Sequence, residues 1–483
     1  MINTKMICRI IGFLFFILTT MLLVCAGVSL IYGENDLNDF LITAGITAGI
    51  GALLVLMGRK AEKSFNRRDG YLIVSMTWVC FTAFGMLPFI TSGYVPSVTN
   101  AFFETMSGFT TTGATVLDNI ESLPHGLLFW RSFTQWIGGL GIVFFTIAIL
   151  PIFGMGNVQL AAAEATGPTH DKVHPRVGVT AKWIWSVYLI LTVTETVLLV
   201  FGGMSLFDSV CHSFSTTATG GYSTKQDSVA YFHSPHIEYV ISAFMILSSL
   251  NFTLLYFSLK GKVGKLFKDA EARWFLSSIG IFTGIIAVTL VFTTPMGAEE
   301  SFRKALFQVA SLHTSTGFGT ADYMNWTPFL WLLLLIAMIC GGCAGSTTGG
   351  LKDIRLVILY RSIKNEFKHI IHPNAVLPIK VNKQVISSSI IIRVLIFVAF
   401  YLIIIAVGWI LMTALGVGYL ESLGTVVSSL GNVGPGLGMC GPAYSWNGLP
   451  DSAKWVLSFL MLIGRLELFT VLLLFSPGFW KKR

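Results

Sequence analysis

Charged residues are scarce in this chain. Asp, Glu, Lys and Arg make up 12% of its 483 residues, hydrophobic residues make up 54%, and the mean hydropathy is +0.73. Soluble globular domains carry about 25% charged residues, so the composition excludes that class and predicts an integral membrane protein. The uncharged stretches are also too long for β-barrel strands, which alternate over segments of about 10 residues. The chain is therefore expected to be all-α.

Signals for disulfide, cofactor and catalytic chemistry are also missing. The seven cysteines are scattered, mostly inside apolar segments, which does not indicate a disulfide framework. Cys340 and Cys343 have CxxC spacing, but they end an apolar span among glycines, where packing is favoured over redox chemistry or zinc. The sequence has no P-loop and no GxGxxG followed by a soluble βαβ unit. We expect no enzyme, no cofactor bound by this chain and no nucleic-acid partner.

Long apolar spans are abundant. Ile10–Tyr32 and Phe40–Gly58 are uncharged, and each can cross a bilayer core of about 30 Å. A unit of three parts then occurs four times: a first span (M1), a short apolar segment and a second span (M2). The M1 spans are Gly70–Thr91, Trp183–Gly203, Trp274–Thr294 and Val394–Leu415; the short segments are Ser97–Phe109, Leu206–Thr216, Phe302–Leu312 and Tyr419–Leu430; the M2 spans are Leu127–Leu150, Tyr239–Leu259, Phe329–Gly345 and Trp455–Pro477. The short segments indicate re-entrant helices.

This layout predicts an all-α integral membrane protein with ten transmembrane helices, in which an N-terminal hairpin precedes four M1–pore-helix–M2 repeats in a pseudo-fourfold arrangement around one pore. The expected boundaries are 1–68 for the hairpin and 69–170, 171–268, 269–365 and 366–483 for the repeats. Lys and Arg concentrate in alternate loops, and the other loops hold only Arg131, Lys225, Arg303, Lys304 and Lys454. Because Lys and Arg mark cytoplasmic loops, both termini are expected inside the cell.

A run rich in threonine or glycine follows each short segment. The runs are Phe109–Ala114, Thr217–Gly221, Thr314–Phe318 and Gly431–Pro435, with Gly113, Gly220, Gly317 and Gly434 aligned. A recurrence at about 100 residues indicates an internal repeat. Backbone carbonyls of converging loops can replace the water of a monovalent cation, and glycine reaches positive φ without steric cost. The runs therefore predict a ring around one ion pathway; the alternative is four unrelated loop glycines.

Five motifs carry a resemblance to a known family. They are Ser107–Ala114, Gln135–Gly139, Gly341–Thr347, His372–Ala375 and Gly434–Gly438. With them the chain resembles Trk-type potassium uptake membrane subunits, within the superfamily of K⁺ transporters that includes the Trk, Ktr and HKT proteins. The resemblance extends over essentially the whole chain, including the first hairpin. It implies a K⁺-conducting subunit, usually a homodimer, in the bacterial inner membrane.

The resemblance also implies which residues bind K⁺ in a selectivity filter, the only metal site expected. They are Thr111, Thr112 and Gly113 in the first run, Ala218, Thr219 and Gly220 in the second, Ser315, Thr316 and Gly317 in the third, and Asn432, Val433 and Gly434 in the fourth. Glycine at all four aligned positions favours K⁺ over Na⁺. The runs differ in sequence, so strict rejection of Na⁺ is left open.

Two further features indicate a gate. The third M2 ends in a stretch with so many glycines that its helix should break inside the membrane, since each costs about 1 kcal/mol relative to alanine; close helix packing is the alternative. Arg465 lies inside the last M2, where a charge is costly and usually functional, although it could also pair structurally or snorkel. The resemblance implies a gate below the filter, made of Gly345, Ser346, Thr347, Thr348, Gly349, Gly350 and Arg465.

The basic stretch Lys352–Lys383 has two readings. It could contact anionic lipid headgroups, whereas the resemblance implies a docking surface for a TrkA-type cytoplasmic subunit, through which any dependence on NAD, ATP or ADP would enter. The expected function is K⁺ uptake through a channel-like pore. The alternative is a secondary symporter coupling K⁺ to H⁺ or Na⁺, for which Glu195 in the second M1 is the obvious residue. Glu104 and Glu421 could attract cations or brace a filter loop.

Overall fold

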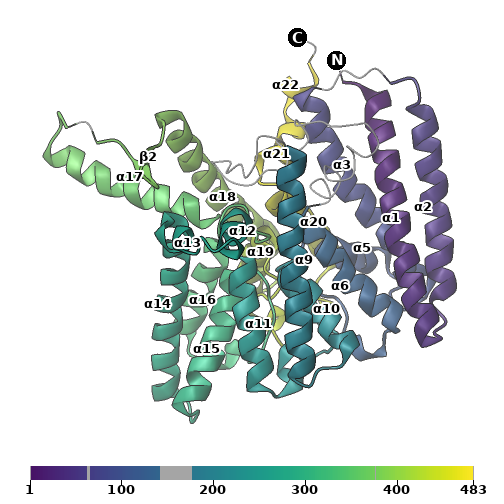
Figure 1. Ribbon diagram of the computed structural model, residues 1–483, viewed down its shortest axis with the longest axis horizontal. Coiled ribbons are helices and arrows are strands. Elements are labelled where there is room, and N and C mark those ends of the chain that lie inside the picture. Colours follow the sequence, from purple (N-terminus) through teal and green to yellow (C-terminus); the bar gives the residue numbers. More distant parts are fainter. Residues whose placement is uncertain (1, 62–65, 142–176, 376, 482–483) are drawn as a thin grey trace.

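The computed structural model describes residues 2–61, 66–141, 177–375 and 377–481. Apart from one small hairpin, the regular elements in these ranges are helices. Helices α1 (Thr4–Tyr32) and α2 (Leu37–Met57) form an antiparallel pair along one side of the molecule (Figure 1, right). Their backbones approach closely, since a Cβ on Gly12 would lie 2.8 Å from the Gly51 carbonyl oxygen. Glycine at this crossing lets two otherwise apolar helices pack.

Four long helices correspond to the M1 spans. They are α3 (Arg67–Gly85) with its short continuation α4 (Leu87–Thr91), α9 (Val177–Phe201), α14 (Ala270–Thr293) and α18 (Ser388–Ala414). Their outer faces carry exposed apolar side chains such as Phe201, Phe292 and Ile410. Exposed apolar surface on long apolar helices is what a lipid-facing perimeter requires.

The four short segments are helices, buried over most of their length. They are α5 (Val98–Phe109), α10 (Leu206–Thr217), α15 (Ala298–His313) and α19 (Tyr419–Gly431). Serine side chains fix two of the starts, because Ser97 accepts a hydrogen bond from the Asn100 amide and Ser205 accepts one from the Asp208 amide. The expectation of short helices before the four runs is confirmed.

The M2 segments differ from the sequence prediction of long continuous helices. In the second repeat, α11 (Pro235–Ser248) and α12 (Phe252–Leu259) meet at 108°, and in the fourth, α20 (Asp451–Arg465) and the helical turns at 469–475 meet at 109°. In the third, α16 (Pro328–Cys340) ends at the glycine-rich stretch. In the first, α6 (His125–Gly139) precedes residues outside the described ranges.

The breaks have local causes. Asn251 caps α12 by accepting a hydrogen bond from the Thr253 amide, which starts a new helix after the bend. In the fourth repeat, Glu467 and Leu468 both have positive φ, 54° and 46°, which no continuous helix contains. By length and composition, six helices in the described residues can cross a membrane, or up to eight if each bent pair counts once. The protein is therefore a multi-pass membrane protein, while ten spans remain a prediction.

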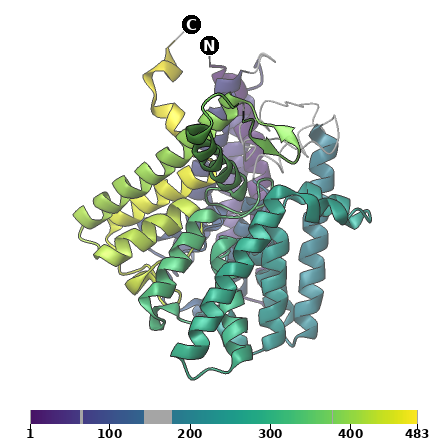
Figure 2. The same cartoon turned by 90° about the vertical axis from the view of Figure 1, so that its left-hand side faces the viewer.

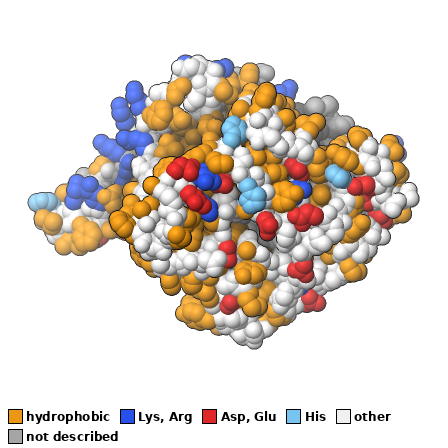
Figure 3. Space-filling model, turned by 90° about the horizontal axis from the view of Figure 1, so that it is seen from below, with side chains coloured by type: hydrophobic (Ala, Val, Ile, Leu, Met, Phe, Trp, Pro, Cys, Tyr) orange, Lys and Arg blue, Asp and Glu red, His pale blue; other side chains and the backbone are white. Residues whose placement is uncertain are grey.

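Helix α17 (Asp353–Ile371) projects from the body, followed by the antiparallel pair β1 (Lys380–Val381) and β2 (Gln384–Val385) (Figures 1 and 2). Lys and Arg gather on this projection, whereas Asp and Glu are spread over the face that Figure 3 presents, which is the lower end in Figure 1. The termini lie together at the end away from that acidic face (Figure 1). The remaining α-helices of the described residues are short: α13 (Gly264–Lys268), α21 (Phe469–Leu472) and α22 (Pro477–Trp480).

Candidate functional site

The runs that follow the four short helices have the same backbone conformation. We name them loop 1 (Thr110–Ala114), loop 2 (Ala218–Tyr222), loop 3 (Thr314–Phe318) and loop 4 (Gly431–Pro435). Each contains a non-glycine residue at positive φ and, two positions later, a glycine at positive φ. The pairs are Thr111 (54°) and Gly113 (85°), Thr219 (53°) and Gly221 (78°), Ser315 (52°) and Gly317 (89°), and Asn432 (53°) and Gly434 (104°). Four identical signatures identify the loops as structural equivalents.

This conformation corrects the alignment of the second run. The residue equivalent to Gly113 is Gly221, not Gly220, because Gly221 has the positive φ. The predicted trio Ala218, Thr219 and Gly220 therefore starts one position early, and Thr219–Gly221 is the equivalent of Thr111–Gly113. Two consecutive glycines, Gly220 and Gly221, end the threonine run, so the sequence offered no way to choose between them.

The four loops meet in cyclic order. A Cβ added to the glycine of each loop would overlap a carbonyl oxygen of the next loop, and the chain of contacts returns to its start. The contacts are Gly113 with the Gly220 carbonyl, Gly221 with Thr316, Gly317 with Val433, and Gly434 with Thr112. Each carbonyl belongs to the residue just before its loop's glycine. Only glycine fits such close approaches at positive φ, and the arrangement brings four equivalent carbonyls together.

The glycine-rich stretch after α16 folds back beneath these loops. Gly341, Gly345 and Gly350 have positive φ of 74°, 75° and 74°, so the chain leaves the helix and turns. The Thr347 hydroxyl donates to the Thr217 carbonyl at 3.1 Å, and the Gly349 amide donates to the Ser315 hydroxyl at 2.8 Å. The stretch therefore touches the end of α10 and loop 3.

Arg465 lies at the end of α20 and contacts both loop 1 and the glycine-rich stretch. One guanidinium nitrogen donates to the Thr347 carbonyl at 2.8 Å and to the Thr111 hydroxyl at 3.1 Å. The other donates to the carbonyls of Gly138 and Gly139. A cavity of about 110 Å³ opens beside it, lined by the glycine-rich stretch and by α6, α20 and Lys352. Arg465 thus joins loop 1, the end of α6 and the glycine-rich stretch. Glu467, two residues on, pairs instead with Arg355 of α17.

Sequence reasoning missed two side chains that hold this stretch. A carboxylate oxygen of Glu271 accepts hydrogen bonds from the amides of Ala344 at 2.6 Å and Ile354 at 3.0 Å, on either side of it. Lys352 is 2% exposed and donates to the Thr348 hydroxyl at 3.0 Å. Lys352 was treated as part of the basic cytoplasmic stretch, and no expectation was attached to Glu271. Glu271 lies two residues after Asp269, the cap of α14, so the sequence indicated a helix start there but gave no signal that the side chain is buried.

The three acidic residues singled out in the sequence all lie beside the loops. Glu104 on α5 accepts a hydrogen bond from the Val116 amide at 2.9 Å, just after loop 1. Glu421 on α19 accepts one from the Met439 amide at 3.3 Å, after loop 4. Glu195 on α9 is fully buried next to Thr216 and Thr217 of α10. Glu104 and Glu421 brace the chain that leaves the loops.

The comparisons with known proteins identify a family for the chain. The family described as "TrkH: Cation transport protein" matches residues 36–482. The Trk system potassium uptake proteins TrkH of Escherichia coli strain K12 and of Halomonas elongata are 40% and 38% identical, each over 99% of this chain and 99% and 100% of theirs. TrkG of E. coli K12 is 35% identical over 99% of both chains.

A solved structure shares the fold. The crystal structure of the potassium transporter TrkH from Vibrio parahaemolyticus superposes with a TM-score of 0.89, at 37% identity over 99% of both chains. The relatives are named as transport proteins and not as enzymes. On these matches, which extend over nearly the whole sequence, the chain belongs to the TrkH family of cation transport proteins.

Proposed function

We propose that the protein takes up K⁺ through a channel-like pore whose selectivity filter is formed by loops 1 to 4. The observation that carries this proposal is the cyclic contact between loop glycines and the carbonyls of Thr112, Gly220, Thr316 and Val433. Rings of carbonyls can replace the hydration shell of K⁺. The carbonyl ends of α5, α10, α15 and α19 add negative potential at the same place. The name of the relatives, potassium uptake proteins, points to the same ion.

The filter residues follow from the corrected alignment. K⁺ ligands come from Thr111–Gly113, Thr219–Gly221, Ser315–Gly317 and Asn432–Gly434, with Ala218 at the end of α10 rather than in the ring. The loops differ in side chains, and only loop 4 carries an asparagine at the first positive-φ position. Asn432 donates to the Thr112 hydroxyl at 3.0 Å, which ties loops 4 and 1 together. Such an unequal ring has no symmetry that enforces strict exclusion of Na⁺.

The gate in this proposal is the stretch Gly345–Gly350 together with Arg465. The stretch lies under loops 2 and 3, and Arg465 holds it through the Thr347 carbonyl. A fixed guanidinium charge below the filter also raises the energy of a passing cation, because like charges interact strongly where water is excluded. Opening therefore requires the stretch to move and Arg465 to be released or screened.

Regulation is proposed to enter from the cytoplasm. Helix α17 presents exposed Lys364 and Lys368, and the β1–β2 hairpin presents exposed Lys380 and Lys383. Together they suit a TrkA-type nucleotide-binding subunit, which would bring any effect of NAD, ATP or ADP.

The chain itself is proposed to bind no cofactor, to form a homodimer and to lie in the bacterial inner membrane. The termini lie toward the same end of the molecule as the basic projection (Figure 1), which supports cytoplasmic termini because Lys and Arg mark the cytoplasmic side.

Flux measurements on the purified, reconstituted protein test the proposal. The membrane potential supplies about 2.3 kcal/mol per charge per 100 mV, so a pore needs no second energy source. We expect K⁺ current to reverse at the K⁺ equilibrium potential in planar bilayers. Dependence of K⁺ uptake on a pH or Na⁺ gradient at fixed voltage would favour the symporter, for which the buried Glu195 is the candidate. The absence of any K⁺ flux refutes both.

A further inference from the structure

Loop 2 lacks a stiffening residue that the other three loops have. At the position just before the loop glycine, loops 1 and 3 have Thr112 and Thr316, and loop 4 has Val433. These β-branched residues restrict the chain. Loop 2 has Gly220 there, followed directly by Gly221. A Gly-Gly pair has the largest conformational freedom of any two residues, so the sequence of loop 2 restricts its carbonyls less than the sequences of the other three loops do.

Gln135 on α6 forms hydrogen bonds with two residues of loop 2. Its side-chain nitrogen donates to the Gly220 carbonyl at 2.7 Å, and its side-chain oxygen accepts from the Tyr222 amide at 3.0 Å. The Tyr222 amide can only donate, so it fixes which end of the Gln135 amide faces each partner. Gln135 thus bridges the residues before and after Gly221. A Cβ on Gly220 would lie 2.5 Å from the Gln135 carboxamide carbon, so the bridge occupies the space of the missing side chain.

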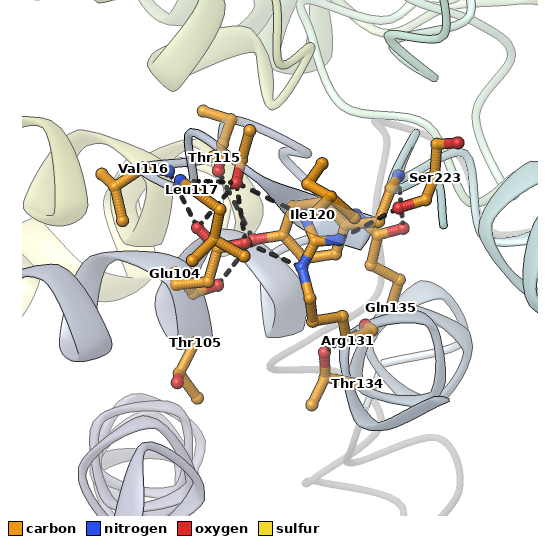
Figure 4. Close-up of polar contacts among 12 residues, drawn as sticks. Glu104, Thr105, Thr115, Val116, Leu117, Ile120, Arg131, Thr134, Gln135 and Ser223 are labelled. Carbon is orange, nitrogen blue, oxygen red and sulfur yellow. Dashed lines mark hydrogen bonds and ion pairs between the residues drawn. The ribbon is translucent and has the colours of Figure 1, made fainter. Parts of the chain in front are cut away.

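Arg131, one helical turn earlier on α6, holds the exit of loop 2 (Figure 4). It donates to the Ser223 carbonyl at 3.0 Å, and its guanidinium lies 4.2 Å from the centre of the Tyr222 ring. Glu104 orients it through an ion pair of 2.9 Å, in which the side chains are 2% and 0% exposed. Glu104 also binds the Thr115 hydroxyl, so the pair connects the chains leaving loops 1 and 2.

A buried ion pair is a weak means of adding stability, because desolvation offsets most of the Coulomb attraction. The corresponding place in the fourth repeat, aligned on Gly138 and Gly464, holds Leu457, which is fully buried without a charge. Packing at this place therefore does not require arginine. What Arg131 supplies beyond a leucine is directed hydrogen bonding to the exit of loop 2.

We propose that Gln135 and Arg131 are positioning residues that set ion selectivity by clamping loop 2, in place of the β-branched residue that this loop lacks. Glu104 acts through Arg131 and holds it in the required orientation. The proposal rests on the filter described under Proposed function. It assigns the discrimination between K⁺ and Na⁺ partly to side chains that touch no ion. It also makes one loop of the four dependent on a neighbouring helix for its shape.

The test compares Na⁺ and K⁺ uptake rates in liposomes containing the full chain, with size-exclusion profiles to select folded variants. We expect Gln135→Ala and Arg131→Gln to raise the Na⁺/K⁺ rate ratio about tenfold, roughly the factor that one net hydrogen bond is worth. Gln135→Ala combined with Gly220→Thr should return the ratio to within about twofold of wild type, since the new side chain stiffens the loop and fills the vacated space. A structural defect alone would not be rescued in this way.

Arg303→Gln is the matched control. Arg303 on α15 forms an ion pair with Glu238 of α11 at 2.8 Å, with side chains 13% and 8% exposed, but neither residue hydrogen-bonds a loop. The Na⁺/K⁺ rate ratio of Arg303→Gln should equal that of wild type. If folded Gln135→Ala and Arg131→Gln keep the wild-type Na⁺/K⁺ rate ratio while wild type takes up K⁺ normally, the clamping of loop 2 is overturned. The proposed function then stands. Failure of the Gly220→Thr rescue overturns the stiffening argument. Absence of K⁺ uptake in wild type overturns the proposed function itself.

Discussion

Replacement of Arg465 by alanine should raise K⁺ flux measured without any partner subunit. The guanidinium holds the glycine-rich stretch through the Thr347 carbonyl at 2.8 Å and also binds the Thr111 hydroxyl at 3.1 Å. Arg465→Ala removes both contacts and the charge. The closed arrangement then loses its connection between α20 and the stretch.

The expected size follows from the contact to Thr347. A hydrogen bond from a charged group contributes about 1.5–3 kcal/mol, and about 1.4 kcal/mol corresponds to a factor of ten. If that contact exists only in the closed state, its loss should raise the open fraction about 10- to 100-fold. Removal of the positive charge should increase the current through each open pore in addition.

The assay is K⁺ efflux from liposomes at a clamped voltage, with equal amounts of folded protein confirmed by size exclusion. Arg465→Lys separates the two contributions. Lysine keeps the charge, but it lacks the planar fork that lets arginine reach several carbonyls at once. High flux in Arg465→Lys would show that the hydrogen bonds close the pore, whereas low flux would assign closure to the charge. Flux in folded Arg465→Ala equal to wild type would refute both parts of the reasoning.

Three further substitutions probe the loops and their supports. Gly221→Ala should reduce K⁺ flux at least about tenfold, because φ there is 78° and a Cβ overlaps the Thr316 carbonyl. Glu271→Ala should lower stability by about 2 kcal/mol or more and raise unregulated K⁺ flux, since two buried amides lose their acceptor. Gly349→Ala should also raise unregulated flux, because its Cβ overlaps the Gly431 carbonyl and prevents the closed arrangement.

Each of these tests has a control or an opposing result. Gly33→Ala changes a glycine of similar φ, 68°, with nothing within 4 Å of its Cβ, so K⁺ flux should stay normal. If Gly221→Ala conducts as well as Gly33→Ala, the corrected alignment of loop 2 is wrong. Thermal unfolding and K⁺ efflux in Glu271→Ala should change together; an unchanged melting temperature contradicts the anchoring role. Low efflux in folded Gly349→Ala would show that the stretch does not need this close approach.

The sequence predicted the parts whose signals are local. Hydropathy and length placed α5, α10, α15 and α19, because a short apolar segment before a glycine cannot span a membrane. The positions of the loops followed from the recurrence of threonine and glycine. Arg465 stood out because an arginine inside an apolar span is rare. These features depend on residues close together in the chain.

The missed features depend on contacts between distant residues. The breaks in the second and fourth M2 segments occur at Asn251 and at Glu467–Leu468, where composition alone permits a continuous helix. The alignment of loop 2 depends on which of Gly220 and Gly221 meets a neighbouring loop. Arg131 was counted with the outer loops and Lys352 with the cytoplasmic stretch, although both are buried. A charge near the end of an apolar span carries no sequence signal that tells a loop position from a buried one.

The proposed gate and the basic projection are connected by short polar contacts. Asn382, in the turn between β1 and β2, donates to Asp269 at 2.6 Å and accepts from the Ala270 amide at 2.8 Å, at the start of α14. The next residue is Glu271, which holds both sides of the glycine-rich stretch. A displacement of the hairpin therefore acts on the start of α14 and, through Glu271, on the stretch under loops 2 and 3. Because these contacts join the hairpin turn to the cap of α14, a shift of the hairpin is expected to change the support of the proposed gate.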